Sequence, residues 1–194
     1  MSDDFQLESE PCVKFNARSG QVSKRKAVRG VVDLYTDGAC CPNPGQGGWA
    51  FVLVGGSKRT EASGACLMQT TNNRMELTAA IEGLKRLKWP CVVRLFTDSA
   101  YLGEGLEWLR KWKDSGWRTG KRKTPVRNRD LWEKLDGYKQ MHNITYHHVK
   151  AHSGHHYNEL CDKLAEEAAA NAMMTVNFQP PPNKKRRPKR KRQS

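Results

Sequence analysis

A short apolar run that ends on an acidic residue constrains this chain more than any other part of its sequence. Residues 31–35 carry the β-branched and aromatic side chains typical of a buried strand, and Asp37-Gly38 follows after Thr36. A carboxylate at the edge of a sheet core is unfavourable unless a partner neutralises its charge. The run therefore predicts a strand over roughly 31–37 whose final carboxylate needs such a partner.

The segments that follow predict two more strands, a helix and a fourth strand. Glycines and prolines between Pro42 and Gly48 indicate a tight loop. Polar capping residues from Thr71 onwards, followed by apolar residues at helical spacing, predict a helix that stops at Trp89-Pro90. We expect the strands at 49–54, around 58–68 and at 91–97. The strand–helix–strand passage favours a fourth strand parallel to an earlier one.

The second half of the chain alternates helical and strand patterns. Short helical pieces are expected from Ala100 to about Trp117, a basic loop over 118–129, and a helix that begins at Asp130. A fifth strand over 144–149 and a loop over 150–156 precede a last helix that runs to about 172. The whole order predicts a mixed α/β sheet with helices on its faces.

Length and composition predict one domain with two flanking segments. A chain of 194 residues can bury a core without disulfides or metals as staples. We expect a disordered amino-terminal arm over 1–29, because its mixed polar sequence lacks periodicity. The folded domain is predicted over 30–174, and a Pro-containing spacer with a basic tail over 175–194.

The sequence predicts an intracellular protein. No run approaches 18 apolar residues, so no membrane span is expected, and the amino terminus lacks the apolar region of a secretory signal. The six cysteines show no CxxC spacing, which favours reduced thiols over disulfides or a zinc site. The cytoplasm of a bacterium is one expected location, and the nucleus, reached through the basic tail 184–192, is the other.

The charge distribution favours a polyanionic partner. The formal net charge is +14, and the tail 184–192 holds eight Lys/Arg and no acid. Between Arg110 and Arg129 there are nine Lys/Arg and one acid, Asp114. A single basic run is usually a solvated face, and an anionic membrane would also attract one. Two runs, one of them interleaved with tryptophans, favour nucleic acid.

Four acids occupy similar positions at the ends of predicted elements. Asp37 and Asp98 end strands, Glu76 falls in the first turn of a helix, and Asp162 falls in an early turn of the last helix. Each alone fits a helix cap or a surface charge. Together, oxygen ligands without a Cys/His set favour Mg²⁺ or Mn²⁺ over zinc. Two such ions about 4 Å apart can hold the attacking and leaving oxygens of a phosphoryl displacement.

Residues 30–172 resemble the ribonuclease H type 1 family. The resemblance rests on four motifs in the family's order and at compatible spacing: YTDG at 35–38, TNNRMEL at 71–77, TDS at 97–99, and HSG…NE…CD between 152 and 162. It implies a ribonuclease H-like fold with a five-stranded mixed sheet flanked by helices. It also implies hydrolysis of the RNA strand of RNA–DNA hybrids, which leaves 5′-phosphate and 3′-hydroxyl ends.

The resemblance also implies a site. The metal ligands would be Asp37, Glu76, Asp98 and Asp162, holding two Mg²⁺ ions, with Mn²⁺ as the substitute. His152 matches the family's catalytic histidine, whose imidazole titrates near neutrality and can carry a proton or assist product release.

Further residues match positions that bind the hybrid. Backbone or 2′-OH contacts are implied for Asn43, Thr71 and Asn72, although the same residues also fit turn and cap roles. A basic protrusion is implied by a set of tryptophans and cations, namely Trp108, Trp112, Trp117, Lys113, Lys121, Arg122 and Lys123. Trp108 and Trp112 are spaced i, i+4, so core packing is equally expected for them.

Two alternatives remain at this point. A nuclease of the same fold could act on another substrate, and a catalytically silent module could bind hybrids without cutting them. The complete set of acids together with His152 favours an enzyme. We expect a monomer, no membrane partner, and a basic tail that binds nucleic acid non-specifically.

Overall fold

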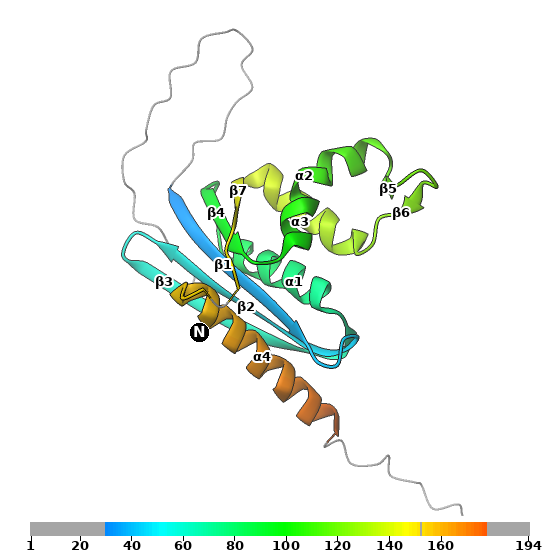
Figure 1. Ribbon diagram of the computed structural model, residues 1–194. Coiled ribbons are helices and arrows are strands. Elements are labelled where there is room, and N and C mark those ends of the chain that lie inside the picture. The colour runs from blue at the N-terminus through cyan, green and yellow to red at the C-terminus, as the bar shows by residue number, and fades with distance from the viewer. Residues whose placement is uncertain (1–29, 152, 178–194) are drawn as a thin grey trace, which may run out of the picture.

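A five-stranded mixed sheet forms the centre of the protein. The computed structural model describes residues 30–151 and 153–177. The strands, in the spatial order β3-β2-β1-β4-β7, are β3 Lys58–Thr70, β2 Gly45–Gly55, β1 Val31–Cys40, β4 Val92–Thr97 and β7 Asn143–His148 (Figure 1). The first three are antiparallel, whereas β4 runs parallel to β1 and β7 runs parallel to β4. The predicted mixed sheet and the parallel fourth strand are therefore confirmed.

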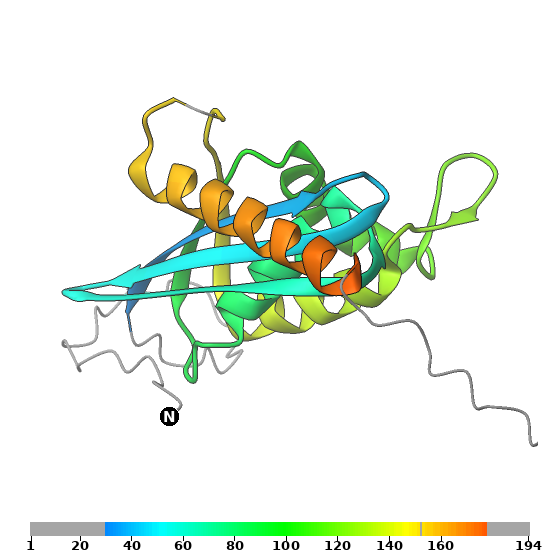
Figure 2. The same cartoon turned by 90° about the horizontal axis from the view of Figure 1, so that it is seen from below.

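Helices cover both faces of this sheet. The long helices are α1 Asn72–Leu84, α2 Ala100–Asp114, α3 Arg129–Met141 and α4 His156–Asn177. Helix α4 alone packs along β1, β2 and β3 on one face, and α1 packs on β1 and β2 from the other, with α2 and α3 beside it (Figure 2). The larger core, which includes Val32, Leu34 and Phe51, lies under α1–α3, and a smaller one around Tyr35 and Ala165 lies under α4.

The expectation of short helical pieces over 100–117 is wrong, because α2 is one continuous helix from Ala100 to Asp114. Gly103 and Gly105 lower the helical signal of this segment, since glycine is a poor helix former. The fold needs at least one of them for close packing. A Cβ on Gly105 would stand 2.0 Å from the Cη2 atom of the fully buried Trp132. The glycine that weakens the sequence pattern thus admits the largest core side chain.

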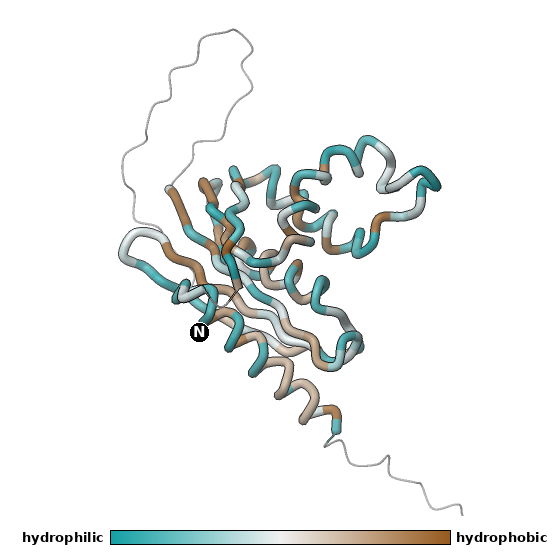
Figure 3. Tube along the Cα trace, in the orientation of Figure 1, coloured by the Kyte–Doolittle hydropathy of each residue, from teal (hydrophilic) through white to brown (hydrophobic). Residues whose placement is uncertain are grey.

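A basic hairpin extends from the end of α2. We use this name for residues 117–128, which include the two short strands β5 Arg118–Thr119 and β6 Thr124–Pro125. The hairpin projects beyond the helical layer (Figures 1 and 2), and its backbone is coloured largely hydrophilic in Figure 3. The predicted basic loop is therefore partly ordered as a two-stranded turn.

Several boundaries differ from those predicted. The strands β1, β2 and β3 are longer than expected, and α4 continues to Asn177, beyond the expected end of the last helix at about 172. Over the described residues, none of the helices combines the length and apolarity that a bilayer crossing requires. The predicted arm 1–29, most of the tail segment and His152 lie outside the described residues.

Candidate active site

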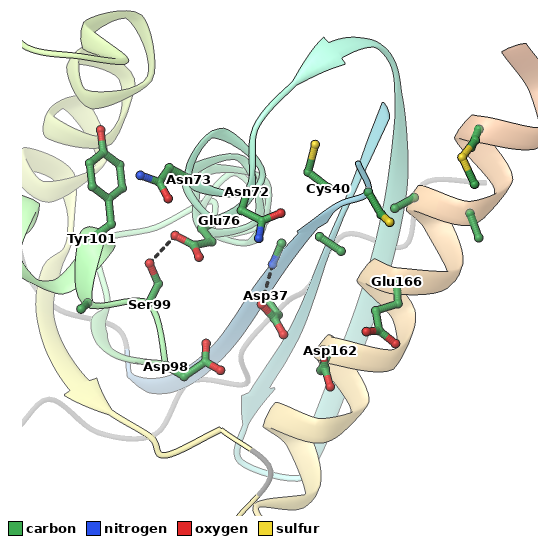
Figure 4. Close-up of a pocket in the computed structure, with 17 residues that line it drawn as sticks. Asp37, Cys40, Asn72, Asn73, Glu76, Asp98, Ser99, Tyr101, Asp162 and Glu166 are labelled. Atoms are coloured by element: carbon green, nitrogen blue, oxygen red, sulfur yellow. Dashed lines mark hydrogen bonds between the residues drawn. The ribbon is translucent and has the colours of Figure 1, made fainter. Parts of the chain in front are cut away.

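The four predicted acids line one pocket. Asp37, Glu76, Asp98 and Asp162 all border a cavity of about 690 Å³ at the carboxyl ends of β1 and β4 (Figure 4). We call it the carboxylate pocket. Strand pairing explains part of this convergence. Tyr35 is opposite Phe96 in the parallel pair β1–β4, so Asp37 in β1 and Asp98, just after the end of β4, both stand two residues beyond this pair.

Glu76 is brought to the pocket by close contact between α1 and β1. It is the fifth residue of α1, rather than a first-turn residue as predicted. A Cβ on Gly38 would lie 2.2 Å from the backbone nitrogen of Glu76 and 2.4 Å from the carbonyl carbon of Met75. Only glycine lets the helix backbone approach β1 this closely beside Asp37.

Burial, together with the neighbouring acids, raises the pKa of Asp37 and of Glu76. The pKa of Asp37 rises from 3.8 to about 8, chiefly through burial and secondly through the charge of Asp98, despite the hydrogen bond of 2.7 Å that the Gly38 N–H donates to Asp37 Oδ1. Burial also raises the pKa of Glu76, with a smaller contribution from Asp98. Both shifts disfavour the charged carboxylates of Asp37 and Glu76, and a bound cation would favour those charged forms.

Ser99 orients Glu76. Its hydroxyl donates to Glu76 Oε2 and accepts from the backbone N–H of Leu102 at 3.1 Å, so the same oxygen also caps α2. This hydrogen bond lowers the pKa of Glu76 against the effect of burial. Ser99 belongs to the TDS motif, but the sequence gives no sign that its hydroxyl faces an acid on another helix.

The donor chemistry of the pocket suits hard divalent cations, because its four carboxylates offer only oxygen ligands. Within the described ranges, however, no three His, Cys, Asp or Glu side chains converge closely enough to hold one ion. The four carboxylates stand around the cavity instead of meeting at one point (Figure 4). The residues fit the group in the kind of ligand that they offer.

The predicted backbone-binding residues lie at different distances from this pocket. Asn72 lines it, and its Oδ1 is buried without a hydrogen-bond partner among the described residues. Thr71 is the N-cap of α1 and accepts a long hydrogen bond of 3.4 Å from the Arg74 N–H. Asn43 is exposed in the loop between β1 and β2 and is not among the lining residues.

The predicted tryptophans fall into two groups. Trp108 is 44% exposed, and Lys111 Nζ lies 4.3 Å from its ring centroid. Trp112 and Trp117 pack against the larger core, and Trp112 meets Trp132 edge to face at 5.4 Å between centroids. Of the i, i+4 pair, Trp112 therefore has the core role and Trp108 the surface role.

The predicted cations also differ in their surroundings. Lys121, Arg122 and Lys123 are all exposed in the turn of the basic hairpin. Lys113 lies on α2 and pairs with Asp136 of α3 at 2.7 Å, so part of its charge is already neutralised. The three hairpin cations are therefore the more accessible to a polyanion.

The pocket also contains residues that the sequence reasoning missed. Asn73, Tyr101 and Glu166 line it in addition to Ser99 (Figure 4). Glu166 follows Asp162 at i+4, a spacing that places both on one face of α4 and could have been recognised. The sequence pattern contains no such signal for Tyr101, because its hydroxyl makes hydrogen bonds to the distant residues Arg127 and Asn128.

Comparison with known proteins gives consistent matches over this region. The family model described as RNase H matches residues 29–170. "Ribonuclease H" of Rhodopirellula baltica is 52% identical over 151 residues, which cover 75% of this chain and 95% of that protein. "Ribonuclease H" of Hydrogenovibrio crunogenus is 54% identical over 138 residues, covering 71% and 94%.

Solved structures match as well. LC9-RNase H1, described as a type 1 RNase H with the type 2 active-site motif, superposes with a TM-score of 0.66 at 25% identity, over 74% of each chain. LC11-RNase H1, solved in complex with RNA/DNA hybrid, matches with a TM-score of 0.55 at 21% identity, over 73% of this chain and 99% of that one. The second match is a likeness of fold.

Proposed function

Because the chain belongs to the ribonuclease H family, whose members are hydrolases acting on RNA in RNA–DNA hybrids, we propose that it cleaves the RNA strand with two divalent ions, Mg²⁺ or Mn²⁺. The products would carry 5′-phosphate and 3′-hydroxyl ends. One observation carries the proposal: four acids from β1, α1, the end of β4 and α4 border one cavity, where Asp37 has a pKa of about 8.

The acids would hold the ions, and the rest of the pocket would hold the substrate. Divalent ions, when bound, stabilise the charge that develops on the attacking and leaving oxygens of a phosphodiester. Ser99 fixes the carboxylate of Glu76, so this ligand loses little rotamer freedom on binding. His152 would move a proton near neutral pH, a role that stays a prediction because this residue lies outside the described ranges.

Recognition of the hybrid would be divided between the pocket and the hairpin. The buried Oδ1 of Asn72 has no donor among the described residues, and a 2′-OH can supply one. Lys121, Arg122 and Lys123 would neutralise phosphates of the DNA strand. Thr71 and Asn43 are proposed as backbone contacts beside Asn72. Binding by the basic tail 184–192 stays a prediction.

Cleavage of an end-labelled RNA strand tests this function. The strand is paired with DNA or with RNA and incubated with Mg²⁺, with Mn²⁺ or with chelator, and Asp98→Asn runs beside it to exclude a contaminating nuclease. We expect metal-dependent cutting of the hybrid alone. The products should carry a 5′-phosphate, which is detected by their ability to be joined by a ligase. Tight binding without cutting at any metal concentration would instead identify a silent binding module.

A further inference from the structure

Arg74 links the start of α1 to the start of α3. It follows Asn72 and Asn73, which line the carboxylate pocket, and its own side chain points to another element. Its Nη1 and Nη2 atoms donate to the two carboxylate oxygens of Asp130 at 3.0 and 2.7 Å. This is a bidentate pair, the geometry in which a guanidinium fixes orientation as well as charge.

Asn128 joins the same network from the end of the basic hairpin. Its Oδ1 accepts from Arg74 Nη1 at 3.2 Å, and its Nδ2 donates to the hydroxyl of Tyr101 at 3.0 Å. The residue precedes α3 with a left-handed φ of 55°, and its side chain makes no capping bond to that helix. Its side-chain amide instead binds Arg74 of α1 and Tyr101 of α2. Asparagine is among the few residues with a side chain that adopt this left-handed backbone conformation readily.

The hydroxyl of Tyr101 is the centre of the network. It accepts from Asn128 Nδ2 and from Trp132 Nε1, at 3.0 and 3.2 Å, and it donates to the carbonyl of Arg127 at 3.3 Å. A phenol has one donor and two acceptor positions, so all three are used. The ring of Tyr101 lines the carboxylate pocket (Figure 4). A pocket residue is therefore hydrogen-bonded to the last residues of the hairpin.

We propose that Arg74, Asn128 and Tyr101 form a positioning network that holds the basic hairpin in register with the carboxylate pocket. Arg74 and Asn128 are positioning residues: they would act by deciding which phosphates of a bound hybrid the hairpin contacts, and hence which RNA bond reaches the acids. This inference rests on the proposed function.

The charges around Arg74 favour positioning over direct phosphate binding. The guanidinium already faces Asp130 and Asn128, and the Asp130 carboxylate raises the pKa of Arg74 while Arg74 lowers that of Asp130. The side chains of Arg74 and Asp130 are 35% and 57% exposed, so water and salt screen their attraction. A modest effect on binding is therefore expected from breaking the pair.

Steady-state cleavage of a hybrid by Arg74→Ala, Asp130→Ala and Asn128→Gly tests the network. Glycine keeps the left-handed backbone at 128 and removes the side chain with its amide. For each variant we expect KM to rise about fivefold and kcat to stay within about twofold. On a hybrid with one labelled end, the positions of cutting should spread to neighbouring bonds.

Asp130→Ala separates positioning from direct contact. It leaves the charge of Arg74 in place, so a guanidinium that binds phosphate itself would bind as well as before or more tightly. That result, or a fall in kcat without a change in KM, would overturn the proposal. The matched control is Arg94→Ala, which breaks a bidentate pair with Asp33 across β1 and β4 at 2.7 Å and should leave KM and the cutting pattern unchanged.

Two further measurements connect the network to the hairpin. In a background with Lys121, Arg122 and Lys123 changed to Ala, Arg74→Ala should add no further rise in KM, because the two changes act through one element. An unchanged fivefold effect there would contradict the proposal. In the Arg74→Ala variant without bound hybrid, amide hydrogen exchange should be faster than in wild type over 118–128 and unaltered in β1 and β4. Exchange does not depend on cleavage, so it decides the positioning role even where wild-type protein cuts no hybrid.

Discussion

The carboxylate pocket and the basic hairpin gather like charges in opposite ways. The pocket takes its acids from positions as distant as Asp37 and Asp162 and fixes them on packed elements, where Asp37 is forced to a pKa of about 8. The hairpin takes consecutive cations, Lys121–Lys123, and leaves them exposed in water. Repulsion is therefore concentrated in the pocket and weak in the hairpin. This difference agrees with the proposed division of roles, in which the pocket carries out catalysis and the hairpin contributes binding affinity.

The largest expected effect is a separation of cutting from binding. Asp98→Asn replaces one negatively charged carboxylate of the pocket with a neutral amide and leaves the hairpin unchanged. We therefore expect the cleavage rate to fall at least about a hundredfold, while the Kd for a hybrid stays within about twofold. Thermal stability should not fall, because Asp98 is a source of repulsion on Asp37. Cleavage assays, binding titrations in chelator and thermal melts measure the three quantities. Loss of folding would show that Asp98 is a structural residue.

The second expected effect concerns pH. The pKa of Asp37 is 3.8 when the side chain is unperturbed, as in the unfolded chain, and about 8 in the folded protein. Between these pH values Asp37 is protonated in the folded protein and ionised in the unfolded chain. Stability without metal should therefore fall as pH rises through this window, and the full penalty is reached above pH 8. Denaturant unfolding in chelator at pH 5 and pH 8 should differ by on the order of a few kcal/mol more in wild type than in Asp37→Asn. Equal pH dependence in both proteins would contradict the shifted pKa.

The third prediction compares the contributions of Trp112 and Trp108, two tryptophans of α2, to the free energy of unfolding. Trp112→Ala should lower the free energy of unfolding by about 2–4 kcal/mol, because the ring packs on the core and against Trp132. Trp108→Ala should change it by less than about 1 kcal/mol, since the ring is 44% exposed. Chemical denaturation of both variants measures the difference. Similar losses would mean that Trp108 is also a packing residue.

The smallest effect is expected from the hairpin charges. Changing Lys121, Arg122 and Lys123 to Ala should raise KM about tenfold at low salt and leave kcat unchanged. The slope of log affinity against log salt should become shallower by up to about one unit for each phosphate that the hairpin no longer neutralises. Changing Lys58, Arg59 and Lys85 to Ala, at the ends of elements away from the pocket, removes the same net charge and serves as the control. An equal rise in KM in the control would show that the effect comes from net charge and not from the position of the hairpin cations.

The chain order of strands, the start of α1 and the candidate acids could be predicted because local signals carry them. The polar cap at Thr71, the apolar run before Asp37 and the strand that ends at Asp98 are each visible in a few consecutive residues. That Asp37 and Asp98 stand beside one another required the family resemblance, because strand adjacency is a long-range property. The pairing of Tyr35 with Phe96 in β1 and β4 supports that expectation.

What the sequence did not reveal depends on contacts between distant segments. Gly105 weakens the pattern of α2, and only the ring of Trp132 explains why a glycine stands there. The bond from Ser99 to Glu76 and the pair Arg74–Asp130 each join residues more than 20 positions apart. The division between Trp108 and Trp112 likewise follows from which side of α2 meets α3. No local pattern contains these facts.

The close approach at Gly38 has a consequence for how precisely the site is built. The segments that carry Asp37 and Glu76 meet backbone to backbone, with no side chain of residue 38 between them. No side chain of residue 38 can therefore alter the separation of the two backbones. The positions of the two carboxylates then depend only on the side chains of Asp37 and Glu76 themselves, and Ser99 holds the second of these.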